Sequence, residues 1–415
     1  MGGMSDTLES LRAEYQSLRD RGLALDLTRG KPSAAQLDLA NGLLDLPLGD
    51  DHTDGAGTDL RNYGGTDGVT ELREIFSELL GIPVPQLLAG GNASLQHMHD
   101  TLVHALLHGV PGGEPWAGKD IAFLCPSPGY DRHFALTQAL GIRMISVPWL
   151  EDGSLDLAAV ERHLADPAVR GMWIVPMYAN PTGMVVDEAT ARALVSMPAA
   201  ADDFRIFWDN AYALHHLTDD EPAPLDILGL AEEAGNPDRV FVYASTSKIS
   251  QAGAGVAFFA SSPANVAWYR KHASVQTIGP DKLSQWRHVR FFGDAEGVRR
   301  HMREHRALLA PKFEIVDRIL TERLTGHATW TKPTGGYFVT LYAPARTASR
   351  AVELAKSIGV AVTPAGAAFP YGDDPHDSVI RIAPSMPTES DLAQAIEALC
   401  VCVLLAEAEL AVSGR

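Results

Sequence analysis

The sequence predicts an α/β fold: a large domain with a mostly parallel, doubly wound sheet, and a smaller α+β domain. Hydrophobic runs without polar alternation, such as 205–208 and 240–244, are typical of parallel strands buried on both faces. Between residues 121 and 260 such runs alternate with helical stretches, which favours a doubly wound sheet. Beyond Gly326 the strand-like runs become shorter, as in an α+β unit.

The elements of the first half follow from hydrophobic periodicity and from turn residues. We expect helices at 8–22, 69–80 and 132–140, and one that begins after 88–96 and runs to about 107. Glycine and proline predict a turn at 25–32, and the Asp- and Gly-rich stretch 43–58 predicts a loop. Strands are expected at 121–125, 144–147 and 172–177.

The second half begins with a strand at 256–260, which we expect to return antiparallel. Helices should follow from 261, with an interruption at 277–282, and continue through 303 to 324. Short strands at 337–342, 360–363 and 379–382 should then alternate with helices at 349–358 and 389–405. We place the large domain at 59–314 and the small domain at 1–58 together with 315–415.

Composition excludes several classes of protein. The net charge of −18 disfavours a nucleic-acid partner, because phosphate binding depends on clustered Lys and Arg. The sequence contains no run of eighteen apolar residues, so we expect no membrane span. We also see no signal peptide at the N-terminus. Three cysteines are too few for a disulfide scaffold. We therefore expect a soluble, cytoplasmic protein that binds neither membrane nor nucleic acid.

The chemistry of the chain is concentrated between Arg205 and Lys248. One buried run ends in Asp209, with Tyr212 three residues later, and the next ends in Ser245, Ser247 and Lys248. Ligands of open α/β sheets bind at the carboxyl ends of the strands. A lysine that forms an imine, an acid that keeps a ring nitrogen protonated and a phenol are what a pyridoxal phosphate (PLP) site needs. The alternative is an ordinary solvated ion pair of Asp209 and Lys248.

Other loops offer further ligand-binding groups. Gly90-Gly91-Asn92-Ala93-Ser94 leads into a helix, which is typical of an anion site but also of a common helix cap. Two strand ends present Tyr130 and Asn180, the latter in an Asn-Pro-Thr-Gly turn. His97, His104 and His108 share a helix face near Asp100, but without a His-Glu-x-x-His motif we predict no metal site.

Together these segments resemble the fold-type I, PLP-dependent aminotransferases over nearly the whole chain. The resemblance is strongest to the bacterial subgroup Ic aspartate aminotransferases, of the MocR-type aminotransferase-like family. It is carried by the runs TRGKPS, YGGTDG, GGNASL, ANPTG, STSKI, TIGPDK and RIAPS. The resemblance implies a mostly parallel sheet of the seven-stranded type, PLP as cofactor, and a homodimer with shared active sites.

The resemblance also implies a role for each matched residue. Lys248 would form the imine with the cofactor and carry the proton, and Asp209 would pair with the ring nitrogen. Tyr212 and Asn180 would donate to the ring oxygen, and Tyr130 would stack on the ring. The phosphate would be bound by Ser94 and the Leu95 amide, by Ser245 and Ser247, and by Tyr63 of a partner subunit.

Substrate binding is implied at Arg381, which would hold the α-carboxylate, with Asn180, Gly30 and Lys31 beside it. The implied reaction moves the amino group of L-aspartate to 2-oxoglutarate by a ping-pong mechanism. The alternatives are an aromatic amino acid such as kynurenine, a PLP lyase or decarboxylase, and the effector-binding domain of a transcription regulator.

The sequence departs from the aminotransferase pattern in one stretch. Residues 251–256 contain no arginine for the cofactor phosphate, where classical members carry one. A buried phosphate dianion without a cation would be costly. We therefore expect a substitute cation, with Lys282 or Lys31 as the candidates.

Overall fold

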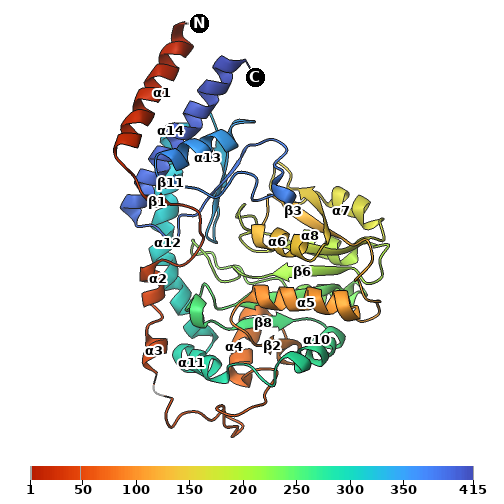
Figure 1. Cartoon of the computed structure of the whole chain (residues 1–415). Helices are drawn as coiled ribbons and strands as arrows, with labels where there is room; N and C mark the ends of the chain where they lie inside the picture. Colours follow the sequence, from red (N-terminus) through yellow and green to blue (C-terminus); the bar gives the residue numbers. More distant parts are fainter. Residues whose placement is uncertain (1, 47, 415) are drawn as a thin grey trace.

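The computed structural model describes residues 2–46 and 48–414, and a seven-stranded sheet lies at its centre (Figure 1). The strand order is β2-β8-β7-β6-β5-β3-β4, and β8 runs antiparallel to both of its neighbours. The predicted fold class is confirmed, as is the antiparallel return at 257–260. The strands are β2 (Leu87–Ala89), β3 (Ala122–Ser127), β4 (Arg143–Pro148), β5 (Val169–Ile174), β6 (Arg205–Asp209), β7 (Val240–Ser245) and β8 (Ala257–Ala260).

Both faces of this sheet are buried. Ile206 and Trp208 of β6 belong to one hydrophobic cluster, whereas Phe207 belongs to another on the opposite face. The period of two along a strand explains why consecutive large residues are buried in different layers. The flanking helices are α4 (Thr70–Leu80), α5 (Ser94–His108), α6 (Asp131–Ala139), α7 (Leu157–Leu164), α8 (Glu188–Ser196), α9 (Ile227–Glu233), α10 (Pro263–Gln276) and α11 (Lys282–Phe292).

A long helix, α12 (Ala295–Leu324), connects this part to a second, antiparallel sheet of order β12-β10-β9. Its strands are β9 (Thr329–Trp330), β10 (Val339–Tyr342) and β12 (Val379–Ile382), accompanied by α13 (Ala348–Ser357) and α14 (Glu389–Ser413). The N-terminal segment joins this region: β1 (Leu25–Asp26) pairs with β11 (Val360–Ala361), and α1 (Gly2–Asp20) lies beside α14 (Figure 1). The division at 59–314 remains a prediction.

Several predicted boundaries need correction. The strand expected at 172–177 ends at Ile174, because the chain leaves the sheet there and turns through Tyr178, whose φ is +52°. The expected loop 43–58 overlaps α3 (Gly42–Asp45), which follows α2 (Ala34–Asp38). The terminal helix continues past residue 405 to Ser413. β2 and β9 are too short to produce a periodic signal.

Single 3₁₀ turns occur at Val84–Gln86, Pro237–Arg239, Ala252–Ala254 and Pro370–Gly372. Across residues 2–46 and 48–414, none of the helices combines the length and the apolar character that crossing a membrane requires.

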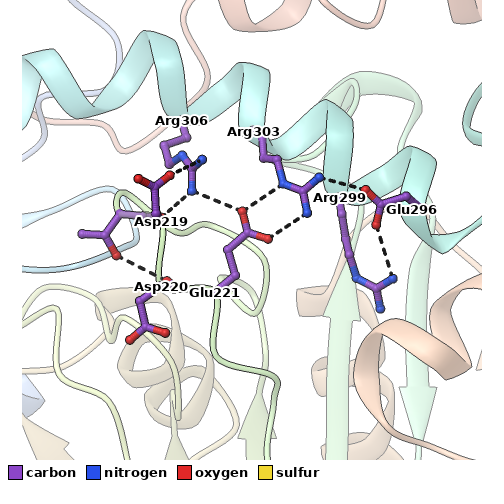
Figure 2. Close-up of polar contacts among 8 residues, drawn as sticks. Asp219, Asp220, Glu221, Glu296, Arg299, Arg303 and Arg306 are labelled. Carbon is purple, nitrogen blue, oxygen red and sulfur yellow. Dashed lines mark hydrogen bonds and ion pairs between the residues drawn. The ribbon is translucent and has the colours of Figure 1, made fainter.

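An ion-pair network attaches the segment after β6 to α12 (Figure 2). Glu221 accepts hydrogen bonds from Arg303 Nε at 3.1 Å and from Arg306 Nη1 at 3.2 Å. Arg306 also pairs with Asp219 at 2.9 Å, and Arg303 with Glu296 at 2.8 Å. Because several charges act together, this network should stabilise the fold more than an isolated surface pair does.

Glu221→Gln should lower the free energy of unfolding by about 1 kcal/mol at low salt, and by less in 1 M salt, where charges are screened. The Arg303 guanidinium holds the pKa of Glu221 below its ordinary value. The stabilisation of the fold by ionised Glu221 is therefore fully present above about pH 4.3, the ordinary glutamate pKa. It is lost as the pH falls through the lowered pKa of Glu221.

Urea unfolding at both salt concentrations measures the effect. Glu188→Gln, which removes an exposed pair with Arg192, is the control and should have a smaller effect. A loss that is equal at both salt concentrations would contradict an electrostatic origin.

Candidate active site

Asp209 ends β6 as a buried carboxylate, 2% exposed. Its Oδ2 lies 3.0 Å from His133 Nε2, while its Oδ1 is buried and has no hydrogen-bond partner within the described part of the chain. Leaving a buried carboxylate oxygen without a donor is costly, so this atom indicates a place for a ligand N–H. The protonated ring nitrogen of PLP fits that requirement.

Sequence reasoning missed His133, the partner of Asp209. The imidazole is buried in α6 and stacks on Trp173, with ring centroids 4.2 Å apart and planes 11° apart. It also meets the edge of Tyr130 at 4.9 Å. The available signal was spacing: His133 follows Tyr130 by three residues, about one helical turn, so both can serve one site.

Lys248 lies in the loop after β7, and its amine sits 4.8 Å from the centre of the Tyr212 ring. Burial lowers the pKa of Lys248, and the Asp209 carboxylate partly opposes that shift. A lowered pKa increases the fraction of neutral amine, the form that attacks a carbonyl. The Lys248 carbonyl lies 3.3 Å from His215 Nε2 and accepts a 3.4 Å hydrogen bond from the Tyr337 hydroxyl.

The start of α5 lies against the loop that carries Lys248. Ser247 Oγ donates to the Asn92 carbonyl at 3.2 Å, and the Ser247 amide donates to Ser245 Oγ at 3.4 Å. α5 begins at Ser94. Its N-cap residue, Ala93, has no polar side chain that could accept hydrogen bonds from the amides of the first turn. Such a helix end, with Ser94 and Leu95 in the first turn, could hold the cofactor phosphate.

Two tyrosines and an amide complete the surroundings of Asp209. Burial and then the Asp209 carboxylate raise the pKa of Tyr130. The pKa of buried Tyr212 is raised by desolvation first, with Tyr130, Tyr337 and Asp209 contributing. Both phenols therefore remain protonated hydrogen-bond donors at neutral pH. Asn180, 4% exposed, lies next to Arg381, with 3.4 Å between its Oδ1 and Arg381 Nη1.

Arg381 comes from the second sheet and is held from several sides. Its Nη1 pairs with Asp131 Oδ1 at 3.1 Å, and its Nη2 donates to Thr363 Oγ1 at 3.0 Å and to the Thr28 carbonyl at 3.3 Å. The guanidinium also lies 5.1 Å from the centre of the Phe338 ring. Its buried Nε has no partner in residues 2–46 and 48–414, which leaves one N–H for a bound carboxylate.

Gly30 allows the 28–31 turn to lie directly on Phe338. A Cβ at Gly30 would stand 2.2 Å from Phe338 Cζ, closer than atoms can approach. The turn thereby brings the Thr28 carbonyl to Arg381. Lys31, which follows, has an exposed side chain. The assignment of Gly30 and Lys31 to substrate binding remains a prediction.

Some predicted residues lie apart from this cluster. Tyr63 is 82% exposed on a surface loop. Lys282, a candidate cation for the phosphate, donates to the carbonyls of Asn62 and Gly64, and its role toward the phosphate remains a prediction. His97 lies 2.7 Å from the Gly90 carbonyl and 2.6 Å from the Tyr269 hydroxyl. Among the residues that the structure describes, no three His, Cys, Asp or Glu side chains are grouped to hold a metal ion.

His133→Phe should destabilise the protein by about 1–3 kcal/mol, because Asp209 Oδ2 then loses its buried donor. Chemical unfolding without added cofactor measures this loss. His376→Phe, a change at an exposed histidine, is the control. In the His133→Phe background, Asp209→Asn should cost less than it does in the wild type. Additive losses would contradict the coupling.

Comparisons with known proteins agree with this geometry. The aspartate aminotransferase family model matches residues 2–414. An aspartate aminotransferase of Corynebacterium glutamicum is 50% identical, covering 97% of this chain and 94% of its own. A crystal structure of an aspartate transaminase from that species superposes with a TM-score of 0.96 at 49% identity, covering 99% of this chain and 97% of the other.

A more distant structure shows the fold alone. The α-aminoadipate aminotransferase LysN of Thermus thermophilus, solved with N-(5'-phosphopyridoxyl)-L-leucine, gives a TM-score of 0.74 at 21% identity and covers 98% of each chain. The family model and the Corynebacterium relative cover almost the whole sequence. This chain therefore belongs to the aspartate aminotransferase family.

Proposed function

We propose that this aminotransferase moves the amino group of L-aspartate to 2-oxoglutarate through PLP, producing oxaloacetate and L-glutamate in two half-reactions. The observation that carries this proposal is the pairing of two incomplete groups in one site. Asp209 Oδ1 needs a ligand donor, and Arg381 Nε needs a ligand acceptor. The ring nitrogen of the cofactor would supply the donor for Asp209, and the carboxylate of an amino acid would supply the acceptor for Arg381. The choice of aspartate is supported by the name of the Corynebacterium relative.

Each residue would have a distinct task in the reaction. PLP, when bound, supplies an electron sink that stabilises the carbanion formed at the substrate Cα. Asp209, oriented by His133, would keep the ring nitrogen protonated. The Lys248 amine would take the proton from the substrate Cα and return it on the cofactor side. Arg381 would hold the α-carboxylate so that this proton faces Lys248.

The remaining groups would bind and orient the cofactor. Tyr212 and Asn180 would donate to its ring oxygen, and Tyr130 would pack on its face. Ser94, Ser245 and Ser247, with the Leu95 amide, would hold the phosphate, and Tyr63 of a second copy would complete that contact. We therefore also propose a homodimer with shared sites.

A dicarboxylate substrate needs a second cation, and the basic residues available for it are Lys31, Arg29, Lys282, Arg287 and Arg290. Arg290 is paired with Asp51 by hydrogen bonds of 2.5 and 2.6 Å, and Lys282 is bound to backbone carbonyls. Arg29 and Lys31, both exposed, flank Gly30 directly after the Thr28 carbonyl that Arg381 contacts. Their position beside the α-carboxylate arginine supports aspartate and 2-oxoglutarate as substrates.

The visible absorption spectrum tests the proposal. The purified protein should show the yellow band of a lysine-bound cofactor, and L-aspartate alone should convert it to the pyridoxamine form. Adding 2-oxoglutarate should restore the band. If only a different amino acid, such as kynurenine, converts the band, the aspartate assignment is wrong. If no band forms with added PLP, the assignment of Lys248 and Asp209 is wrong.

Arg381→Lys should raise the KM for L-aspartate by about 10- to 100-fold, because a lysine ammonium has no donor at the position of Arg381 Nε and cannot keep the contacts that orient the guanidinium. The cofactor band should stay unchanged, because Arg381 contacts the substrate rather than the ring. Steady-state kinetics with a coupled oxaloacetate assay measure the effect, and Arg318→Lys, at an exposed site of α12, is the control. An unchanged KM would contradict the assignment.

A further inference from the structure

Lys282 is a buried lysine with an unusual set of partners. It opens α11 and is 5% exposed. Its ammonium donates to the Asn62 carbonyl at 2.7 Å and to the Gly64 carbonyl at 2.8 Å. Among the described residues, Lys119 and Lys332 are the lysines that form salt bridges, and Lys282 forms none. Burying an ammonium is costly without such hydrogen bonds, so this arrangement ties α11 firmly to the 62–64 loop.

The two carbonyls that Lys282 holds lie immediately before and after Tyr63. The Tyr63 side chain itself is 82% exposed. Gly64 and Gly65 adopt left-handed φ values of +95° and +68°, and a Cβ at Gly65 would stand 3.2 Å from Lys282 Cδ. The methylene chain of Lys282 therefore packs beneath Gly65, while its ammonium binds the backbone carbonyls on either side of Tyr63.

Two exposed apolar side chains lie on the segment that contacts the Tyr63 loop. The Gly64 amide donates to the Ile278 carbonyl at 3.3 Å, which joins the Tyr63 loop to the segment after α10. Ile278 is 65% exposed, and Val275 nearby in sequence is 89% exposed. Exposed apolar side chains close to an exposed tyrosine whose loop is held by a buried lysine indicate a surface that a protein covers. A second copy of this chain is the occupant that the proposed shared site requires.

We propose that Lys282 is a positioning residue: it holds Tyr63 outward so that its hydroxyl reaches the cofactor phosphate of a second copy of the chain. This inference rests on the proposed function, because it takes the ligand of Tyr63 to be that phosphate. It also removes Lys282 as the substitute cation for the arginine missing from 251–256, which leaves Lys31 as the candidate. Lys282 serves the phosphate through Tyr63 and its loop, rather than as a direct ligand.

The test compares PLP with pyridoxal, which lacks the phosphate but still reacts with Lys248. Absorbance titration of the cofactor-free protein measures both affinities without any amino-acid substrate. Lys282→Met should weaken PLP binding by about 10-fold or more, the loss expected for one hydrogen bond to a charged group, and leave pyridoxal binding within about 2-fold. Lys282→Arg, which keeps a donor cation, should recover most of the PLP affinity. Lys271→Met, at an exposed lysine of α10, is the control.

Tyr63→Phe distinguishes a Lys282 that positions Tyr63 from a Lys282 that contacts the phosphate directly. If Lys282 acts through Tyr63, the double variant should bind PLP no more weakly than the weaker single variant. Additive losses would mean that the ammonium contacts the phosphate itself, which overturns the positioning role. Equal losses for PLP and pyridoxal would indicate only a structural role, and an unchanged PLP affinity would remove any role. Both overturn the proposal.

Hybrid dimers test whether Tyr63 serves the second copy. A Lys248→Ala chain, which keeps Tyr63, is co-expressed with a Tyr63→Phe chain, which keeps Lys248. If Tyr63 acts across the interface, the one competent site of the hybrid should bind PLP with wild-type affinity. Weak binding like that of Tyr63→Phe alone would overturn this part of the proposal. A wild type that binds PLP but ignores aspartate would overturn only the proposed substrate, and one that binds no PLP would overturn the proposed function itself.

Discussion

The buried carboxylate of Asp209 is the constraint around which the site is arranged. It is 2% exposed, and His133 satisfies only one of its two oxygens. The imidazole is in turn stacked on Trp173 of the neighbouring strand β5, so the orientation of Asp209 depends on that packing. A buried charge of this kind is tolerated only where its neighbours and a ligand compensate for it. The need for a ligand is thus part of the stability of the fold.

The parallel sheet explains why residues distant in sequence reach Asp209. Tyr130, Asn180 and Lys248 follow β3, β5 and β7, whose carboxyl ends lie on one edge of the sheet. Arg381 arrives from a different sheet and is held by contacts with Asp131 and Thr28. The site therefore lies where the two parts of the molecule meet. The network of Glu221 with α12 strengthens that junction near the residues that follow Asp209.

Three buried or half-buried lysines illustrate how surroundings give one side chain different uses. Lys248 has an aromatic ring and a carboxylate as neighbours and a lowered pKa, which suits a reactive amine. The Lys282 ammonium donates hydrogen bonds to the two backbone carbonyls that flank Tyr63. Lys312 donates to the Ser385 carbonyl at 2.8 Å, four residues beyond Arg381, and thereby ties α12 to the strand end that carries the arginine. Lys282 and Lys312 thus hold loop backbone in place, whereas the amine of Lys248 is available for reaction.

The sequence by itself determined the fold class, because unbroken hydrophobic runs alternating with helices can form few other architectures. It also predicted that Asp209, Tyr212 and Lys248 form one site, since Asp209 ends a recognisable strand and the other two closely follow one. Tertiary structure alone decided the role of His133, whose carboxylate partner lies 76 residues away in the chain. It likewise decided the clamp of Lys282 on Asn62 and Gly64, 220 and 218 residues away. Local pattern encodes strands and turns, whereas hydrogen bonds between distant segments depend on how the chain packs.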